Sequence, residues 1–462
     1  MLAVALLLAL SGIFPISLVV QQSIMEGDRA LASGDAPAAL AAYQAAAAAM
    51  PWNALPLERA VQIEMTAGRY ARAEEGLRRI AALSGWTPDL HRRLGEVFHA
   101  RGETALAVAE WEAALEHAPD DGDALRALAE AHLQARDYEQ AAAALGRLVE
   151  AAPQEMWAHY RLGLLVASYD AEAAAHHLTA AAADPTFGAA AEAVVETLDA
   201  LSGEADRAYA SAQLALTLMQ LEEWAAAEQA LSVALLFSPR YAEAMAYLGL
   251  VQDRLGDDGL PALLQAVALE PENPLVRHAL GRHYAEVGDY DAAIPALIQA
   301  AALRPDNPVA LAELGAAYSA RGDLADAAQW FHRAAELDRD NPFFWEQLAA
   351  FYADTGYNLE EEGLAAINSA LLNAPDNADI LASFGWARNQ MGDQAGAMRA
   401  LEQALEIDSA HPRALYYYGV LLEITGDTVG AVDVYLNVVR VAPGTRFGAL
   451  AERGLSRLGA NP

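Results

Sequence analysis

The chain has 462 residues, of which 55% are hydrophobic, and this proportion argues for packed structure and against disorder. Aspartate and glutamate number 63, whereas the 29 basic residues are all arginine, so the formal net charge is -34. Such an acidic chain repels nucleic-acid phosphates and attracts basic segments of other proteins, although the charge could also serve solubility alone. The absence of cysteine excludes disulfides, thiolate zinc sites and cysteine nucleophiles.

The first twenty residues form an apolar segment. Leu2–Val20 carries no charged side chain, and as a helix it would be about 28 Å long, close to the roughly 30 Å hydrocarbon thickness of a bilayer. We therefore expect residues 1–20 to form a membrane anchor, a single N-terminal span with the rest of the chain on the extracytoplasmic side. The alternatives are a cleaved signal segment of a secreted protein and a buried first helix of a cytoplasmic one.

The rest of the chain repeats with a period of about 34 residues, and each period predicts two amphipathic helices joined by a short turn. The clearest example starts at Pro88 and continues with Leu94, Gly95, Phe98, the turn Gly102-Glu103, Ala107, Trp111, Ala114 and Pro119. This pattern resembles the tetratricopeptide repeat. Twelve repeats can be assigned, with first residues near 20, 54, 88, 122, 156, 208, 242, 274, 308, 342, 378 and 412.

Two positions of the repeat hold small residues. The eighth is glycine or alanine in every repeat except the second, where it is Val61, and the twentieth is alanine or glycine throughout. Small residues at both positions predict a close approach of the two helices. Proline near the end of most repeats stops the second helix, and the asparagine of pairs such as Asp306-Asn307 and Asp376-Asn377 suits the cap of the next helix.

The resemblance implies an all-α, right-handed superhelical solenoid of about twelve helix-turn-helix units. Repeats one to five occupy 20–186 and repeats six to twelve occupy 208–445. The stretch 187–207 does not fit the repeat and predicts one unpaired linker helix, while 446–462 predicts a C-terminal cap helix and tail. Repeat ten is about two residues longer than the others, around 358–363.

The sequence holds no catalytic constellation, because phosphate loops, G-x-S-x-G and H-E-x-x-H are all missing. His176 and His177 are adjacent, so on a helix their side chains diverge and do not converge on one metal. The run Glu360-Glu361-Glu362 is better explained as a solvated helix start. We therefore expect no enzyme activity, no cofactor and no metal site.

In this family a partner's peptide or helix often binds along the concave face, which is formed by the first helix of each repeat. Transferring those positions to this chain places charged side chains in repeats three and four: Asp89, Arg92, Glu96, Asp123, Arg126 and Glu130. Large apolar candidates for partner binding are Trp157, Tyr160, Leu164, Tyr209, Leu216, Met219, Phe343, Trp386 and Tyr416. The alternative for repeats five and six is that the unpaired helix covers these side chains and makes them core.

Together these features predict a non-catalytic scaffold or assembly factor, anchored in a membrane, that holds other proteins and takes part in a membrane protein complex. A soluble or secreted regulatory subunit of an enzyme or envelope complex is the alternative. No nucleic-acid partner is expected.

Overall fold

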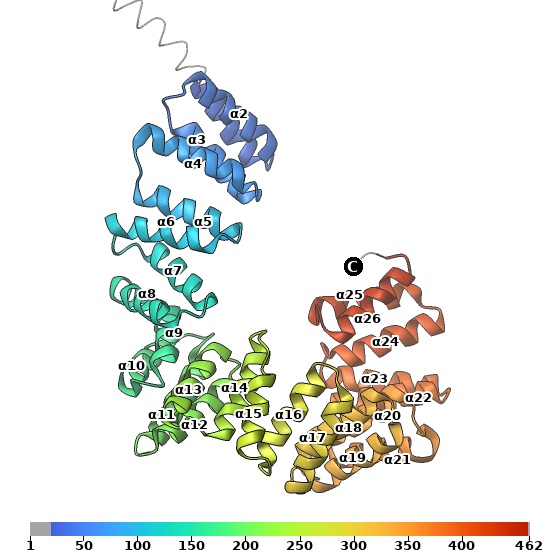
Figure 1. Cartoon of the computed structure of the whole chain (residues 1–462). Coiled ribbons are helices and arrows are strands. Elements are labelled where there is room, and N and C mark those ends of the chain that lie inside the picture. The colour runs from blue at the N-terminus through green and yellow to red at the C-terminus, as the bar shows by residue number, and fades with distance from the viewer. Residues whose placement is uncertain (1–19, 461–462) are drawn as a thin grey trace, which may run out of the picture. The chain divides into compact units, whose positions relative to one another are not determined.

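A computed structural model describes residues 20–460, which form helices joined by short turns and no strand (Figure 1). Residues 20–32 are helical and precede α2. The chain divides into two compact parts, one ending at Phe237 and the other beginning at Ser238. The first part contains α2 (Ala36–Ala49), α3 (Leu55–Thr66), α4 (Tyr70–Ser84), α5 (Pro88–Ala100), α6 (Thr104–His117), α7 (Gly122–Gln134), α8 (Tyr138–Ala151), α9 (Met156–Val166), α10 (Ala171–Ala181), α11 (Gly188–Leu201), α12 (Arg207–Gln220) and α13 (Trp224–Phe237).

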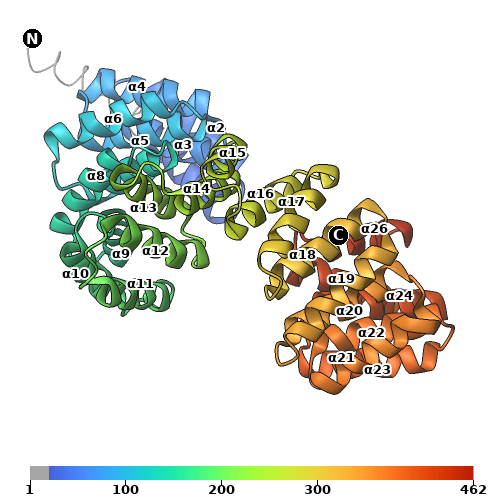
Figure 2. The same ribbon diagram turned by 60° about the horizontal axis from the view of Figure 1, so that its bottom comes forward.

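The second part has the same helical make-up, with one short π-helical segment, η1. Figure 2 shows its helices α20, α22 and α24 side by side, as expected for equivalent helices of successive repeats. Its elements are α14 (Ala242–Arg254), α15 (Leu260–Leu269), α16 (Pro274–Glu286), α17 (Tyr290–Leu303), α18 (Pro308–Arg321), α19 (Leu324–Leu337), α20 (Pro342–Thr355), η1 (Leu359–Gly363), α21 (Leu364–Asn373), α22 (Ala378–Gln390), α23 (Gln394–Ile407), α24 (Pro412–Thr425), α25 (Thr428–Val441) and α26 (Arg446–Arg457).

The helices pack in pairs, so the predicted all-α, repeat-based fold is confirmed, whereas the handedness of the superhelix stays a prediction. A first helix packs on the second helix of its own repeat, as α5 does on α6 and α16 on α17. Among residues 20–460, no helix combines the length and apolarity needed to cross a bilayer. The apolar segment predicted to be an anchor falls almost entirely within residues 1–19, outside the described residues.

Side-chain caps fix where the first helices begin. The Asn307 side chain accepts hydrogen bonds from the backbone N–H groups of Val309 and Ala310, and Asn377 accepts one from Ile380. These bonds satisfy amides that have no partner within the helix. At its other end α18 stops at Gly322, whose φ of 100° is a left-handed conformation that suits glycine.

The eighth position must be small because a large side chain of the second helix lies directly over it. A Cβ added to Gly95 would lie 2.4 Å from Nε1 of Trp111, and one added to Gly419 would lie 2.8 Å from the ring of Tyr435. Repeat two, the exception at Val61, reverses the arrangement. There the glycine is Gly76 on the second helix, where a Cβ would lie 2.4 Å from Val61.

Two irregularities interrupt the pairing of helices. In repeat ten the extra length is taken up by η1, where the Gly363 N–H donates to the carbonyl of Asn358, five residues earlier. The helix α11 has no partner of its own and lies between α10 and α12, packing on both. It belongs to the first compact part, since the division between the two parts falls after α13.

Candidate functional site

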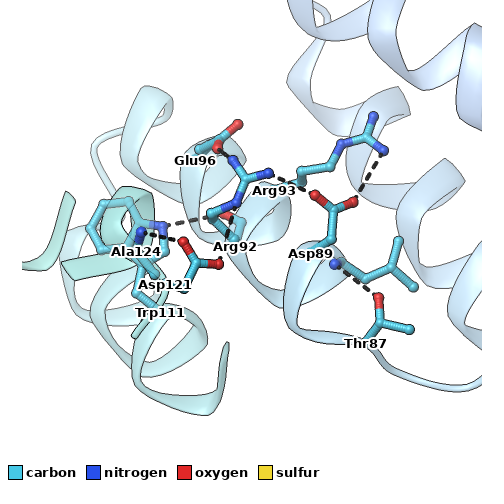
Figure 3. A network of polar contacts seen from close by, with 9 residues as sticks. Thr87, Asp89, Arg92, Arg93, Glu96, Trp111, Asp121 and Ala124 are labelled. Atoms are coloured by element: carbon cyan, nitrogen blue, oxygen red, sulfur yellow. Dashed lines mark hydrogen bonds and ion pairs between the residues drawn. The ribbon is translucent and has the colours of Figure 1, made fainter. Parts of the chain in front are cut away.

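The first helix of repeat three carries an arginine surrounded by carboxylates (Figure 3). The Arg92 guanidinium donates to Asp89 at 2.6 Å and to Glu96 at 2.6 Å, and its Nε lies 3.8 Å from Asp121. The Arg92 backbone carbonyl accepts a hydrogen bond from Nε1 of the buried Trp111 at 3.2 Å. The core of the repeat therefore holds this part of α5 in place, and α5 presents the charged group.

The next repeat contains the same arrangement 34 residues later. Arg126 on α7 donates to Glu130 at 3.2 Å and to Glu155 at 2.6 Å. Its guanidinium also lies 4.5 Å from the centre of the Trp157 ring, within the range of a cation–π interaction. We call the face formed by α5 and α7, with the acidic residues that precede α7 and α9, the acidic ladder.

Carboxylates outnumber arginines on the acidic ladder. Five carboxylates are in contact with three guanidinium groups: Asp89, Glu96, Asp121, Glu130 and Glu155 against Arg92, Arg93 and Arg126. Burial raises the pKa of Glu96 above its ordinary value, and Asp89 adds to the rise, although Arg92 and Arg93 act to lower it. The ladder therefore keeps a net negative charge that its own arginines do not cancel.

Repeat five places two of the predicted binding residues in the core. Tyr160 is 2% exposed, stacks on Phe187 with ring centres 4.9 Å apart, and donates its hydroxyl to Glu223 at 2.9 Å. Leu164 is buried as well. Glu223 lies in the turn between α12 and α13 and also accepts from Arg161 at 2.6 Å. Tyr160 and Leu164 therefore hold helices together and offer no surface to a partner in this structure.

The other candidates of repeats five and six remain at least partly accessible. Trp157 is half-buried beneath Arg126, and Leu216 and Met219 on α12 are half-buried too. Tyr209 is 42% exposed near the start of α12. The turn at Glu223 and the segment that begins with Phe187 therefore cover the candidates on α9 more than those on α12.

The candidates of the later repeats lie in two different settings. Phe343 is 47% exposed at the start of α20. Trp386 stacks on Tyr417 with ring centres 4.6 Å apart, and Tyr416 lies 5.9 Å from Phe447 of α26. Trp386 and Tyr416 are half-buried members of this aromatic cluster, so only part of each ring is open.

Sequence analysis missed a second charged cluster, on α16 and α18. Arg282 lies 3.5 Å from Glu286 and 3.5 Å from Glu313, and Nε2 of His278 lies 2.5 Å from Glu313. A groove of about 350 Å³ runs beside Arg282 over the small side chains Ala316 and Ala320. His278 and Arg282 stand at the fifth and ninth positions of repeat eight, so the positional pattern could have found them.

A histidine pair also escaped the sequence analysis, because its members come from different helices. Nδ1 of His159 lies 3.1 Å from Nδ1 of His177, and Nε2 of His159 lies 3.2 Å from the carbonyl of Pro153. His159 is 6% exposed. Across residues 20–460 the structure brings no three metal-ligating side chains together.

Comparison with protein families gives matches to the tetratricopeptide repeat, one model matching residues 59–124, 278–342 and 383–444 and another matching 98–161. No curated protein matches. Among solved structures, yeast Tom70 is 16% identical with a TM-score of 0.42, covering 88% of this chain and 95% of its own. A tetratricopeptide repeat protein from Parabacteroides merdae is 15% identical with a TM-score of 0.44, covering 58% of this chain and 99% of its own. The Cut9–Hcn1 hetero-tetramer of the APC/C is 13% identical with a TM-score of 0.38, covering 95% and 96%.

Proposed function

We propose that this chain, a tetratricopeptide-repeat protein, is a scaffold that holds partner proteins by their basic segments on the acidic ladder of repeats three and four. Tetratricopeptide-repeat proteins are generally non-catalytic, and their repeats serve protein–protein interaction. The observation that carries the proposal is the excess of carboxylates around Arg92 and Arg126.

A basic side chain of a partner would pair with the negative charge that the ladder's own arginines leave uncompensated. The side chains of Glu96 and Glu130 are partly exposed, and each forms an ion pair with one arginine of its own helix. A second cation beside such a carboxylate adds an ion pair of roughly 0.2–1 kcal/mol, and several in series add further if the geometry is held. The ion pairs with Arg92 and Arg126 hold the carboxylates in that geometry before the partner arrives.

The experiment measures binding of a short fluorescein-labelled arginine-rich peptide to the purified chain by fluorescence anisotropy. The test variant is Glu96→Gln with Glu130→Gln, which removes two ladder charges. The matched control is Glu112→Gln with Glu150→Gln, which removes the same charge from exposed positions on α6 and α8, the second helices of the same repeats. We expect the test variant to bind about tenfold more weakly and the control to bind within about twofold of the parent.

Equal weakening of both variants would show that the peptide responds only to the overall charge of the chain, and the proposed site would then be wrong. A glutamate-rich peptide of the same length should not bind. Raising the salt concentration should weaken binding of the arginine-rich peptide, because exposed charge pairs are screened.

We also propose that the apolar residues 2–20 tether the scaffold to a membrane, on the strength of their composition alone. The alternative is a soluble or secreted regulatory subunit of an enzyme or envelope complex. Fractionation of cells that express the full chain separates the two, because the tether requires recovery in the membrane fraction and release by detergent but not by high salt. Recovery in the soluble fraction with residues 1–20 still present would refute the tether.

A further inference from the structure

Two exposed tryptophans stand in the turns that follow α2 and α4. Trp52 is 66% exposed and Trp86 is 45% exposed. They occupy the same position in repeats one and two, so the stacking of repeats places them on one edge of the first part. Five later repeats have an acidic residue at this position instead: Asp120, Glu272, Asp306, Asp340 and Asp376. Large apolar side chains that gather on an exposed edge mark a surface that something else covers.

The stretches around both tryptophans are free of charge, although 20% of the chain is charged. Residues 36–57 contain Trp52, residues 80–88 contain Trp86, and neither stretch holds an aspartate, glutamate, arginine or histidine. Leu55 and Leu83, in the same stretches, are exposed as well. The two turns can therefore approach an apolar or zwitterionic surface without removing a charge of their own from water.

The helix of residues 20–32 is fixed against α2. The two helices are joined by a short turn and run antiparallel. Gly27 lies against the ring of Tyr43, since a Cβ added to Gly27 would lie 2.5 Å from Cε1 of that ring. The buried Tyr43 hydroxyl also donates to Asp28 at 2.6 Å. The helix α2 is therefore held to the residues that directly follow the apolar segment 2–20.

This contact puts Trp52 at the end of repeat one where the apolar segment joins it. Val20 comes seven residues before Gly27, and Met50 comes seven residues after Tyr43. Because the helices are antiparallel, Val20 and Met50 both lie about 10 Å from the contact, towards the same end of the pair. Trp86, at the corresponding position of repeat two, lies on this side as well. A bilayer that holds residues 2–20 would meet both tryptophans.

We propose that Trp52 and Trp86 rest in the head-group region of a phospholipid bilayer, so that the first two repeats contact the membrane directly. Tryptophan is enriched at this depth because its ring is apolar and its N–H meets polar head groups. The edge suits zwitterionic lipid, because the net charge of -34 opposes an approach to anionic head groups. The inference rests on the membrane tether proposed above and adds that the repeats themselves touch lipid.

The test uses the full chain reconstituted into phosphatidylcholine vesicles. Because the chain has no cysteine, Ala49→Cys places a single NBD fluorophore at the exposed end of α2, close to Trp52. The matched control is Ala38→Cys, an exposed alanine on the same helix, about 16 Å away. A label about 5–10 Å into the head-group boundary is within reach of doxyl-labelled phosphatidylcholine and should lose about half of its fluorescence. The label at position 38 should be little affected.

Trp52→Glu combined with Trp86→Glu tests whether the tryptophans hold this edge on the bilayer. Both side chains are exposed, so their replacement removes no core contact. The double variant should stay with the vesicles, while quenching at position 49 falls to the level at position 38. Leu372→Glu combined with Val429→Glu, at exposed apolar positions of the second part, is the matched control and should leave the quenching unchanged.

Flotation of the chain with the vesicles reports the tether separately. If the chain floats but position 49 is not quenched, or is quenched equally in the tryptophan variant, the inference is wrong and the tether stands. If the chain does not float, both are wrong. A label at position 49 that leaves water without being quenched by the doxyl lipid would show that a second copy of the chain covers this edge, and would also overturn the inference.

Discussion

Replacing Gly95 by alanine tests the close approach of the two helices in repeat three. The new Cβ would lie 2.4 Å from Nε1 and 2.6 Å from Cδ1 of Trp111, far inside van der Waals contact. Trp111 is almost completely buried, so its ring cannot move out into solvent. It must shift within the core and give up its hydrogen bond to the carbonyl of Arg92.

The expected size follows from three opposing contributions. Overpacking of a filled core costs about 1–3 kcal/mol, and a buried indole N–H left without its acceptor costs about 1–3 kcal/mol more if the bond is lost completely. Alanine in place of glycine within a helix returns about 1 kcal/mol. We therefore expect Gly95→Ala to lower the free energy of unfolding of this repeat by about 3 kcal/mol.

Hydrogen exchange measured by mass spectrometry reports this loss locally, because the stability of a repeat protein is a sum over repeats and their interfaces. The slowest amides of α5 and α6 should exchange about a hundredfold faster in the variant. Gly146→Ala is the matched control: it lies inside α8 with nothing within 4 Å of the added Cβ, and it should stabilise its helix slightly. If Gly95→Ala behaves like Gly146→Ala, the close approach does not limit the eighth position and the reasoning is wrong.

Three further predictions concern single side chains. Burial and the neighbouring His159 lower the pKa of His177 in the folded chain. The unfolded chain therefore binds this proton more readily, so the stability of the fold is full above about pH 6.5 and declines as the pH falls below it. Urea midpoints should fall less between pH 7 and pH 5 in His177→Gln than in the parent. Asp354→Ala should lower the free energy of unfolding by about 2 kcal/mol, because it leaves the buried Tyr417 hydroxyl without the acceptor 2.6 Å away. In a double-mutant cycle, adding Tyr417→Phe should recover part of this loss. Losses that simply add would contradict the pairing. Asn307→Ala removes the cap of α18 and should lower the unfolding free energy by about 1 kcal/mol in chemical denaturation, and no change would mean that the cap contributes nothing.

The repeat could be predicted from sequence because its determinants are local. A small residue at the eighth position, a proline after the second helix and a capping asparagine act within one repeat, so each leaves a signal at a fixed spacing. Val61 was read as an exception to the small-residue rule. The small residue that makes room for it, Gly76, lies on the second helix at a position where the repeat pattern specifies no residue type. The extra length of repeat ten was visible in the sequence. That the extra residues form a π-helical segment could not be predicted, because it depends on backbone hydrogen bonding.

The site was less predictable because it depends on contacts between repeats. Arg92 and Arg126 stand where the positional pattern places a binding face. Tyr160 was predicted by the same reasoning, but it is buried, since Phe187 comes from the stretch that does not fit the repeat and Glu223 comes from the turn of another repeat. The pairing of His159 with His177 likewise required two helices to be placed against each other.

The contact of Tyr160 and Arg161 with Glu223 gives the first part of the chain a mechanical property that a simple stack of repeats lacks. It joins residues 62 positions apart and closes α10, α11 and α12 into a loop. Tension applied along the chain would pass to α13 through this contact and through Glu228, which accepts a hydrogen bond from Tyr138 at 2.8 Å and lies 3.6 Å from Arg136, and would bypass the loop. The enclosed helices would feel the load only after the contacts at Glu223 and Glu228 had broken, and the chain would then lengthen in one sudden step.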